Sequence, residues 1–160
     1  MIMARHAVDR IFVMAIMVSV LSCQAAPAVS TEEEWQSLTD EALDHYQYGN
    51  NKEAVIVAKD AVKMAEELFG PDDLRVAGSI DNLATYLAAT GRTEEADRLY
   101  RRALAMLEKK LSPDDSYLAI FMDYLAVFYG KIGNDGYAKE LREHAKKIRL
   151  EGYEKSIFRQ

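Results

Sequence analysis

Apolar residues recur along much of the chain at steps of three and four, with charged residues between them. Ala96, Leu99, Ala103 and Met106 form one such series. This spacing places the four side chains on one face of an α-helix. Similar series, interrupted by glycines, predict six helices at roughly 32–48, 52–69, 74–90, 94–111, 116–131 and 135–152. The sequence therefore predicts an all-α protein.

A period of 42 residues links these predicted helices. The segment Gly70-Pro71-Asp72-Asp73 returns 42 positions later as Ser112-Pro113-Asp114-Asp115. Seven apolar or glycine positions recur three times each: Leu38, Ile80 and Met122; Ala42, Ala84 and Ala126; Gly49, Gly91 and Gly133; Ala54, Ala96 and Ala138; Val57, Leu99 and Leu141; Ala61, Ala103 and Ala145; Met64, Met106 and Ile148. Repeats of this kind indicate stacked helix hairpins that bury a continuous core. We assign the hairpins to residues 32–73, 74–115 and 116–152.

Polar residues before the predicted helices have the pattern of helix caps. Thr31 with Glu34 forms a capping-box pair, and Asn50 with Glu53 repeats that spacing before the second helix. The recurring aspartate pairs are explained as connectors that cap the following helix, which leaves no need for a catalytic role.

The last eight residues, 153–160, are too few for a further hairpin. Tyr153, Ile157 and Phe158 would either fold over the last hairpin or belong to a frayed tail. Without such a cover, the stripe of Leu141, Ala145 and Ile148 is expected to stay exposed and to favour a homodimer through the C-terminal end.

The segment Ile80-Asp81-Asn82-Leu83-Ala84, with Gly91, Ala96 and Ala103, resembles the tetratricopeptide repeat. The 42-residue spacing and the Gly-Pro-Asp-Asp connector are similar to the variant found in kinesin light chains. The resemblance covers residues 35–149. The first repeat departs from it with Glu41 where leucine is usual, and the third has Tyr124 where the second has Asn82. It implies an α-solenoid of three hairpins that binds a protein or peptide.

The resemblance also implies that the first helix of each hairpin lines a concave groove. By position, the partner-binding residues would be Thr39, Leu43, Tyr46, Asp81, Asn82, Thr85, Asp123, Tyr124 and Val127. None is basic, so the clamp that some family members use for a terminal carboxylate is not expected. Asp81 and Asp123, with Asp40 nearby, would form an acidic track for a segment rich in lysine or arginine. Alternatively, these aspartates are solvated and keep the protein soluble.

The first 30 residues differ in character from the repeats. Residues 11–21 are an apolar run that follows two arginines, as in a secretory signal, and the run is too short for a stable membrane span. Val20-Leu21-Ser22-Cys23 resembles a bacterial lipobox, which implies cleavage after residue 22 and lipidation of Cys23. Residues 23–31 would then tether the repeats to a membrane of the cell envelope. The alternative is cleavage at Ala26-Pro27-Ala28, which would give a soluble periplasmic protein.

Charge and the remaining side chains narrow the classes of function. The full chain has a net charge of −6, and cleavage before Cys23 would make it −7, which argues against a nucleic-acid partner. His45 and His144 lack metal-spaced companions, and His45 is expected in the helix core, so neither a metal nor another cofactor is predicted. No phosphate-binding glycine loop occurs. We expect a non-enzymatic module that binds protein, with a self-associating structural solenoid as the alternative.

Overall fold

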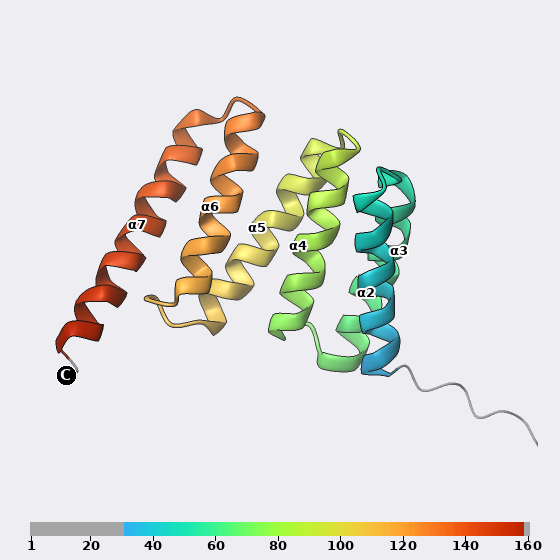
Figure 1. Ribbon diagram of the computed structural model, residues 1–160, viewed down its shortest axis with the longest axis horizontal. Helices are drawn as coiled ribbons and strands as arrows, with labels where there is room; N and C mark the ends of the chain where they lie inside the picture. Colours follow the sequence, from blue (N-terminus) through green and yellow to red (C-terminus); the bar gives the residue numbers. More distant parts are fainter. Residues whose placement is uncertain (1–30, 159–160) are drawn as a thin grey trace, which may run out of the picture.

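The computed structural model describes residues 31–158, which form six α-helices joined by short turns. In chain order these are α2 (Glu32–Gln47), α3 (Asn51–Phe69), α4 (Leu74–Ala89), α5 (Thr93–Lys110), α6 (Ser116–Lys131) and α7 (Asp135–Phe158). Taken in pairs, from α2 with α3 at one end to α6 with α7 at the other, they follow one another along the long axis of the molecule (Figure 1). Both ends of the first five helices lie within one residue of the predicted bounds. The prediction of an all-α solenoid is confirmed.

The helices pack as three antiparallel hairpins. Within the hairpins α2 packs against α3, α4 against α5, and α6 against α7. Between them α3 contacts α4 and α5 contacts α6, so the second helix of each hairpin joins the first helix of the next. The contact between α5 and α6 is much less extensive than that between α3 and α4.

Small repeated side chains allow the helices to approach closely. Ala84 and Ala126 have no exposed surface, and Ala42 is 2% exposed. The next alanine set, Ala54, Ala96 and Ala138, is fully buried as well. Because interhelical distance depends on the side chains at the contact, a larger residue at these positions would separate the paired helices. The 42-residue register predicted from the sequence therefore holds.

A glycine lies two residues after the end of the first helix of every hairpin. Gly49, Gly91 and Gly133 have φ values of 80°, 79° and 80°. This left-handed conformation is strained for residues that carry a Cβ, so glycine allows the tight reversal.

The predicted caps are confirmed at three helices and wrong at a fourth. Thr31 and Glu34 form the full capping box, and the side chains of Asp73 and Asp115 accept hydrogen bonds from the backbone N–H two residues on. Asn50 makes no side-chain cap bond. Its backbone N–H instead donates to the His45 carbonyl at 2.8 Å. The tight turn sets the Asn50 ψ angle at 58°, which differs from the extended backbone of the other three caps.

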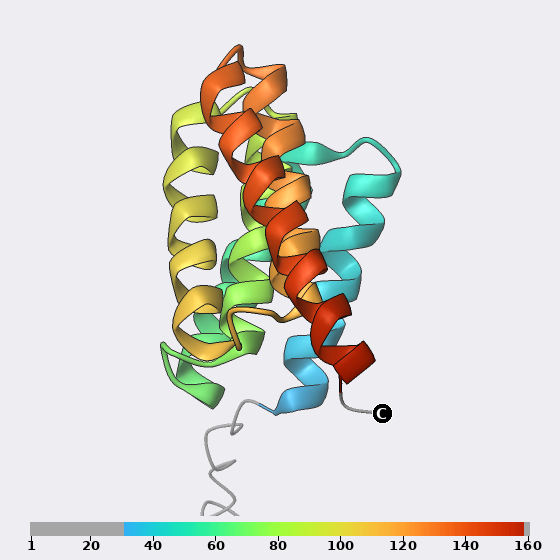
Figure 2. The same ribbon diagram turned by 90° about the vertical axis from the view of Figure 1, so that its left-hand side faces the viewer.

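The C-terminal end differs from both expectations for the tail. Tyr153, Ile157 and Phe158 neither fold back nor fray, because they continue α7 as a helix and are 66%, 50% and 86% exposed. The expectation that Leu141 and Ile148 would then be exposed is wrong, since they are 4% and 2% exposed and face α6. Viewed from this end, α7 lies in front of α6 and slants across the end of the stack (Figure 2). Its inner face closes the core of the described residues, whereas its outer face is mainly charged as far as Arg149.

Candidate functional site

Two adjoining cavities share Asp81, and most of the residues that line them belong to α2, α4 and α6. The larger, of about 490 Å³, is lined by Tyr46, Asp81, Thr85, Ala88, Ala89, Thr93, Tyr100, Tyr124, Val127, Phe128, Lys131 and Ile132. The smaller, of about 280 Å³, is lined by Trp35, Thr39, Arg75, Gly78, Ser79, Asp81, Asn82 and Tyr117. Asp81 borders both cavities. We call the residues lining the two cavities the inner groove.

The side chain of Asp81 is partly buried, and it has no partner among the described residues. Among residues 31–158, no hydrogen bond or ion pair to its side chain is found. Loss of solvent raises the pKa of Asp81 from its ordinary value to about 6. At neutral pH this group is therefore predominantly a partly desolvated anion, and no counter-ion for it is found among residues 31–158.

Tyrosines surround Asp81 from four helices. Tyr46 of α2 packs on Tyr86 of α4 with ring centroids 4.9 Å apart. Tyr100 of α5 forms a 3.0 Å hydrogen bond with Thr85 of α4. Burial, with a smaller contribution from the charge of Asp81, raises the pKa of Tyr100 to about 12 and also raises the pKa of Tyr86. The same two causes raise the pKa of Tyr117 on α6. The carboxylate therefore lies among neutral aromatic rings.

The larger cavity opens where the second and third hairpins are held apart. Tyr100 of α5 packs on Phe128 of α6 with ring centroids 4.8 Å apart. The residue 42 positions before Tyr100 is Ala58 on α3, which is 2% exposed. Since a tyrosine occupies far more space than an alanine, α5 and α6 cannot approach as closely as α3 and α4. One residue of the repeat therefore explains why the cavity lies at this junction.

The smaller cavity is braced by a contact between the first two hairpins. Trp35 Nε1 on α2 donates to Ser79 Oγ on α4 at 3.0 Å, and Ser79 Oγ donates to the Arg75 carbonyl at 3.0 Å. The Trp35 ring also meets Phe69 edge to face at 5.2 Å. These contacts fix α2 beside α4, so the walls of this cavity are formed in the free protein.

Comparison with known proteins identifies the repeat. The family model of the tetratricopeptide repeat matches residues 36–109. Residues 36–109 are tetratricopeptide repeats. No curated protein sequence matches it significantly.

Several solved structures share the fold. BtubC (BKLC) from P. vanneervenii superimposes with a TM-score of 0.68 at 21% identity, over 76% of this chain and 48% of that one. A putative kinesin light chain of Podosopora anserina with nearly identical TPR-like repeats gives 0.68 at 23% identity, over 76% and 58%. A second structure of that protein gives 0.65 at 24% identity, over 72% and 54%. The chain thus spans about half the length of these neighbours. Tetratricopeptide repeats generally act as modules that bind other proteins.

Seven of the nine residues predicted for the tetratricopeptide groove line the inner groove: Thr39, Tyr46, Asp81, Asn82, Thr85, Tyr124 and Val127. The other two do not. Leu43 is 42% exposed and borders neither cavity. Asp123 accepts a 2.6 Å hydrogen bond from Arg149 Nη1 on α7. This ion pair compensates the charge of Asp123, so the acidic track reduces to Asp81 within the groove.

Sequence reasoning missed groove residues outside the expected helix positions. Tyr100 and Thr93 come from α5, the second helix of its repeat, and reach the cavity because α5 and α6 are separated. The replacement of Ala58 by Tyr100 between repeats was the available signal. Trp35 lies one turn before Thr39 on α2, outside the positions that the resemblance implies for the groove.

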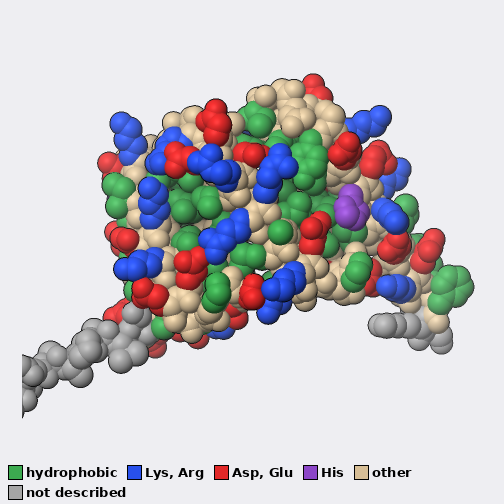
Figure 3. Space-filling view, turned by 180° about the vertical axis from the view of Figure 1, so that it is seen from behind, with side chains coloured by type: hydrophobic (Ala, Val, Ile, Leu, Met, Phe, Trp, Pro, Cys, Tyr) green, Lys and Arg blue, Asp and Glu red, His purple; other side chains and the backbone are tan. Residues whose placement is uncertain are grey.

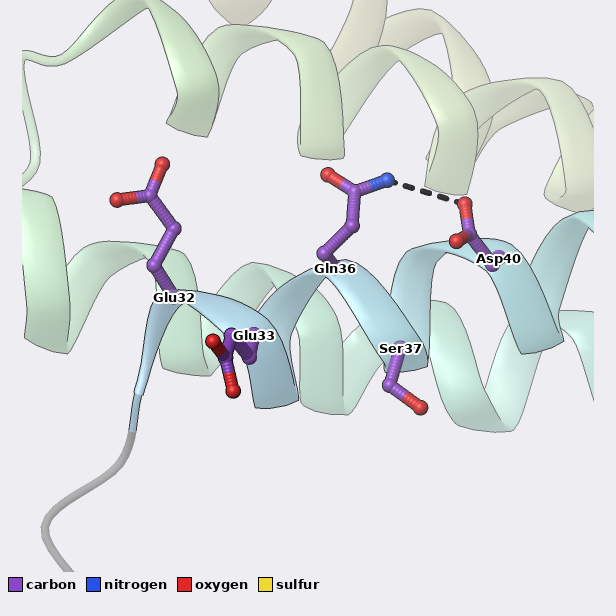
Figure 4. Close-up of a pocket in the computed structure, with 5 residues that line it drawn as sticks. All are labelled: Glu32, Glu33, Gln36, Ser37 and Asp40. Carbon is purple, nitrogen blue, oxygen red and sulfur yellow. Dashed lines mark hydrogen bonds between the residues drawn. The ribbon is translucent and has the colours of Figure 1, made fainter.

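A third depression lies along α2 and lacks the features of a site. Its walls are Glu32, Glu33, Gln36, Ser37 and Asp40, all from one helix, and Gln36 Nε2 donates to Asp40 Oδ1 at 3.0 Å (Figure 4). No residue of a second helix lines this depression. We regard it as a solvated acidic face.

The remaining side chains add no metal centre within the described part of the chain. No cluster of metal-ligating residues occurs between positions 31 and 158. His45, expected in the core, is only partly buried and lies 3.8 Å from Glu41. It occupies the edge of α2 because no hairpin precedes the first repeat within the described residues.

The face opposite to that of Figure 1 carries interspersed acidic and basic side chains (Figure 3).

Proposed function

We propose that this chain binds an unfolded segment of another protein in the inner groove. The observation that carries the proposal is the pair of adjoining cavities with Asp81 at their junction. Their walls combine aromatic and aliphatic surface with a few polar groups, which is the composition of pockets that hold side chains. A segment lying across α4 would place successive side chains in the two cavities.

A photo-crosslinking residue at position 124 tests this proposal. Tyr124 lines the larger cavity and is 70% exposed, whereas Ile56 on α3 is 63% exposed and borders neither cavity. We expect p-benzoylphenylalanine at position 124 to crosslink a specific protein in cells, and the same residue at position 56 not to capture it. Equal capture at both positions would remove the groove as the binding surface.

We also propose that the protein is exported and tethered to a membrane through Cys23. Residues 1–22 and Cys23 lie outside the described residues, so the support comes from the apolar run and the position of the cysteine. Among the described helices, none is long and apolar enough to span a bilayer. A tether from Cys23 to the start of α2 would reach at most about 25–30 Å, which would keep the groove close to the membrane.

Removal of the cysteine tests the tether. We expect Cys23→Ala to move the protein from the membrane to the soluble fraction and to abolish incorporation of labelled fatty acid. A wild-type chain that is soluble and unlabelled would instead favour cleavage at Ala26-Pro27-Ala28.

Self-association in a larger envelope assembly is the alternative function, and one feature favours it. Leu150, Tyr153 and Ile157 recur at steps of three and four along the last turns of α7 and are 54%, 66% and 50% exposed. Sedimentation equilibrium of the purified protein distinguishes the two. A dimer that Tyr153→Glu with Ile157→Glu dissociates would support self-association, whereas a monomer at all concentrations would support the binding module.

A further inference from the structure

We propose that the larger cavity is a specific pocket for the guanidinium group of a partner's arginine side chain, with the Asp81 carboxylate as its counter-ion. This inference rests on the proposed binding of a protein segment in the inner groove. It adds the chemical identity of the residue that the partner must supply.

The first argument is the missing counter-ion. The Asp81 side chain is partly buried, and within residues 31–158 it has neither a hydrogen bond nor an ion pair. Its oxygens still reach solvent, but the surrounding side chains remove part of its hydration, and no described cation compensates for that loss. A cation brought by the partner would restore that compensation, so the interaction gains more here than at a solvated aspartate.

The second argument is the aromatic wall. Tyr46, Tyr100 and Tyr124 line the same cavity, and Thr85 and Tyr100 contribute hydroxyl groups to it. Guanidinium is planar, is more weakly hydrated than ammonium, and stacks on aromatic rings while its N–H groups donate to oxygen acceptors. A cavity with one carboxylate, hydroxyl oxygens and several rings therefore favours arginine over lysine.

The third argument is that no described cation of the protein pairs with Asp81. Arg75 borders only the smaller cavity, where it pairs with Asp73 and Glu32 and lies 3.5 Å above the Phe69 ring. Lys131 borders the larger cavity from the last residue of α6 and makes no detected ion pair with Asp81. Asp81 therefore has no described counter-ion, and a cation from a partner could take that role.

A matched control is present in the chain itself. Asp123 occupies the position of Asp81 one repeat later, but it pairs with Arg149 and borders neither cavity. Substituting asparagine at either position removes the same charge from the same helix position. Only the change at Asp81 should affect binding of an arginine.

The experiment selects peptides from a random dodecapeptide library displayed on phage, using the immobilised full chain. We expect one selected position to be enriched in arginine. A synthetic peptide with the selected sequence is then compared with its citrulline version, which keeps the shape and loses the charge. Asp81→Asn should weaken binding of the arginine peptide at least about tenfold and leave the citrulline peptide nearly unchanged. Asp123→Asn should leave both affinities close to those of the wild type.

The outcomes separate this inference from the proposed function. Peptides that crosslink at position 124 but carry no preferred arginine would overturn the inference and retain the groove. Wild-type affinity of Asp81→Asn for the arginine peptide, with circular dichroism showing an intact fold, would overturn it too. If the library yields no binding peptide, both the inference and the groove proposal fail.

Discussion

At the scale of single residues, two aspartates at the same repeat position lie in opposite environments. Asp123 pairs with Arg149 of the same hairpin, whereas Asp81 is enclosed by the next hairpin and pairs with none of the described residues. Position within the repeat is visible in the sequence. The environment of each carboxylate is not, because it depends on side chains that are distant along the chain.

The unpaired carboxylate predicts an unusual dependence of stability on pH. Because the pKa of Asp81 is about 6 in the folded chain and lower when unfolded, its protonation favours the native state, and this contribution is lost as pH rises from about 4 to about 6. The tyrosines around it stay neutral over this range. We therefore expect Asp81→Asn to raise the free energy of unfolding by about 1–3 kcal/mol near pH 7.5 and by little near pH 4.

Urea titrations of both proteins at the two pH values measure this difference. Asp123→Asn serves as the control, since it removes a partly exposed ion pair and should gain no stability. A loss of stability in Asp81→Asn near pH 7.5 would show that the Asp81 carboxylate has a partner.

The fully buried Ala84 predicts a severe effect of a long side chain. Ala84→Arg places a charge and a large volume at a position with no exposed surface, which would cost several kcal/mol of a total of roughly 5–15. We expect loss of helical circular dichroism. Ala89→Arg, on the exposed end of the same helix, should remain folded. A folded Ala84→Arg would contradict the register of the repeats.

At the scale of helices and turns, the sequence was most informative where local chemistry decides the structure. Apolar spacing and the three glycines determine the helix bounds, and Asp73 and Asp115 cap helices as expected. Prediction failed at Asn50, where turn geometry outweighs residue type, and at the end of α7, where no proline or glycine after position 152 stops the helix. In the groove, residues of the first helices followed from the repeat. Tyr100 did not, because its access depends on the separation of two hairpins.

Two glycines predict opposite responses to alanine. Gly91 has a φ of 79°, so Gly91→Ala should lower the free energy of unfolding by roughly 1–2 kcal/mol. Gly78 lies inside α4, and a Cβ there meets nothing within 4 Å, so Gly78→Ala should raise it by about 0.5–1 kcal/mol. Thermal unfolding followed by circular dichroism measures both. Changes of the same sign would contradict the turn geometry at Gly91.

At the scale of the whole molecule, three hairpins form one continuous core whose two internal junctions differ. The junction of the first and second hairpins is tight and contains small residues such as Ala58. At the junction of the second and third, Tyr100 and Phe128 hold the helices apart, and Tyr129 reaches across to donate a hydrogen bond to Asp97. The loose junction creates the larger cavity, so the place of weakest packing is also the proposed place of binding.

The loose junction also has a consequence for the cooperativity of unfolding. In a linear array each unit is stabilised through its neighbours alone, so a reduced interface lowers the free energy needed to open the unit beyond it. The third hairpin, α6 with α7, should therefore open separately while the first two stay closed. Native-state hydrogen exchange is expected to show lower protection in α6 than in α4. A segment bound across α4 and α6 would make the two hairpins open together, and protection in α6 would then rise towards that of α4.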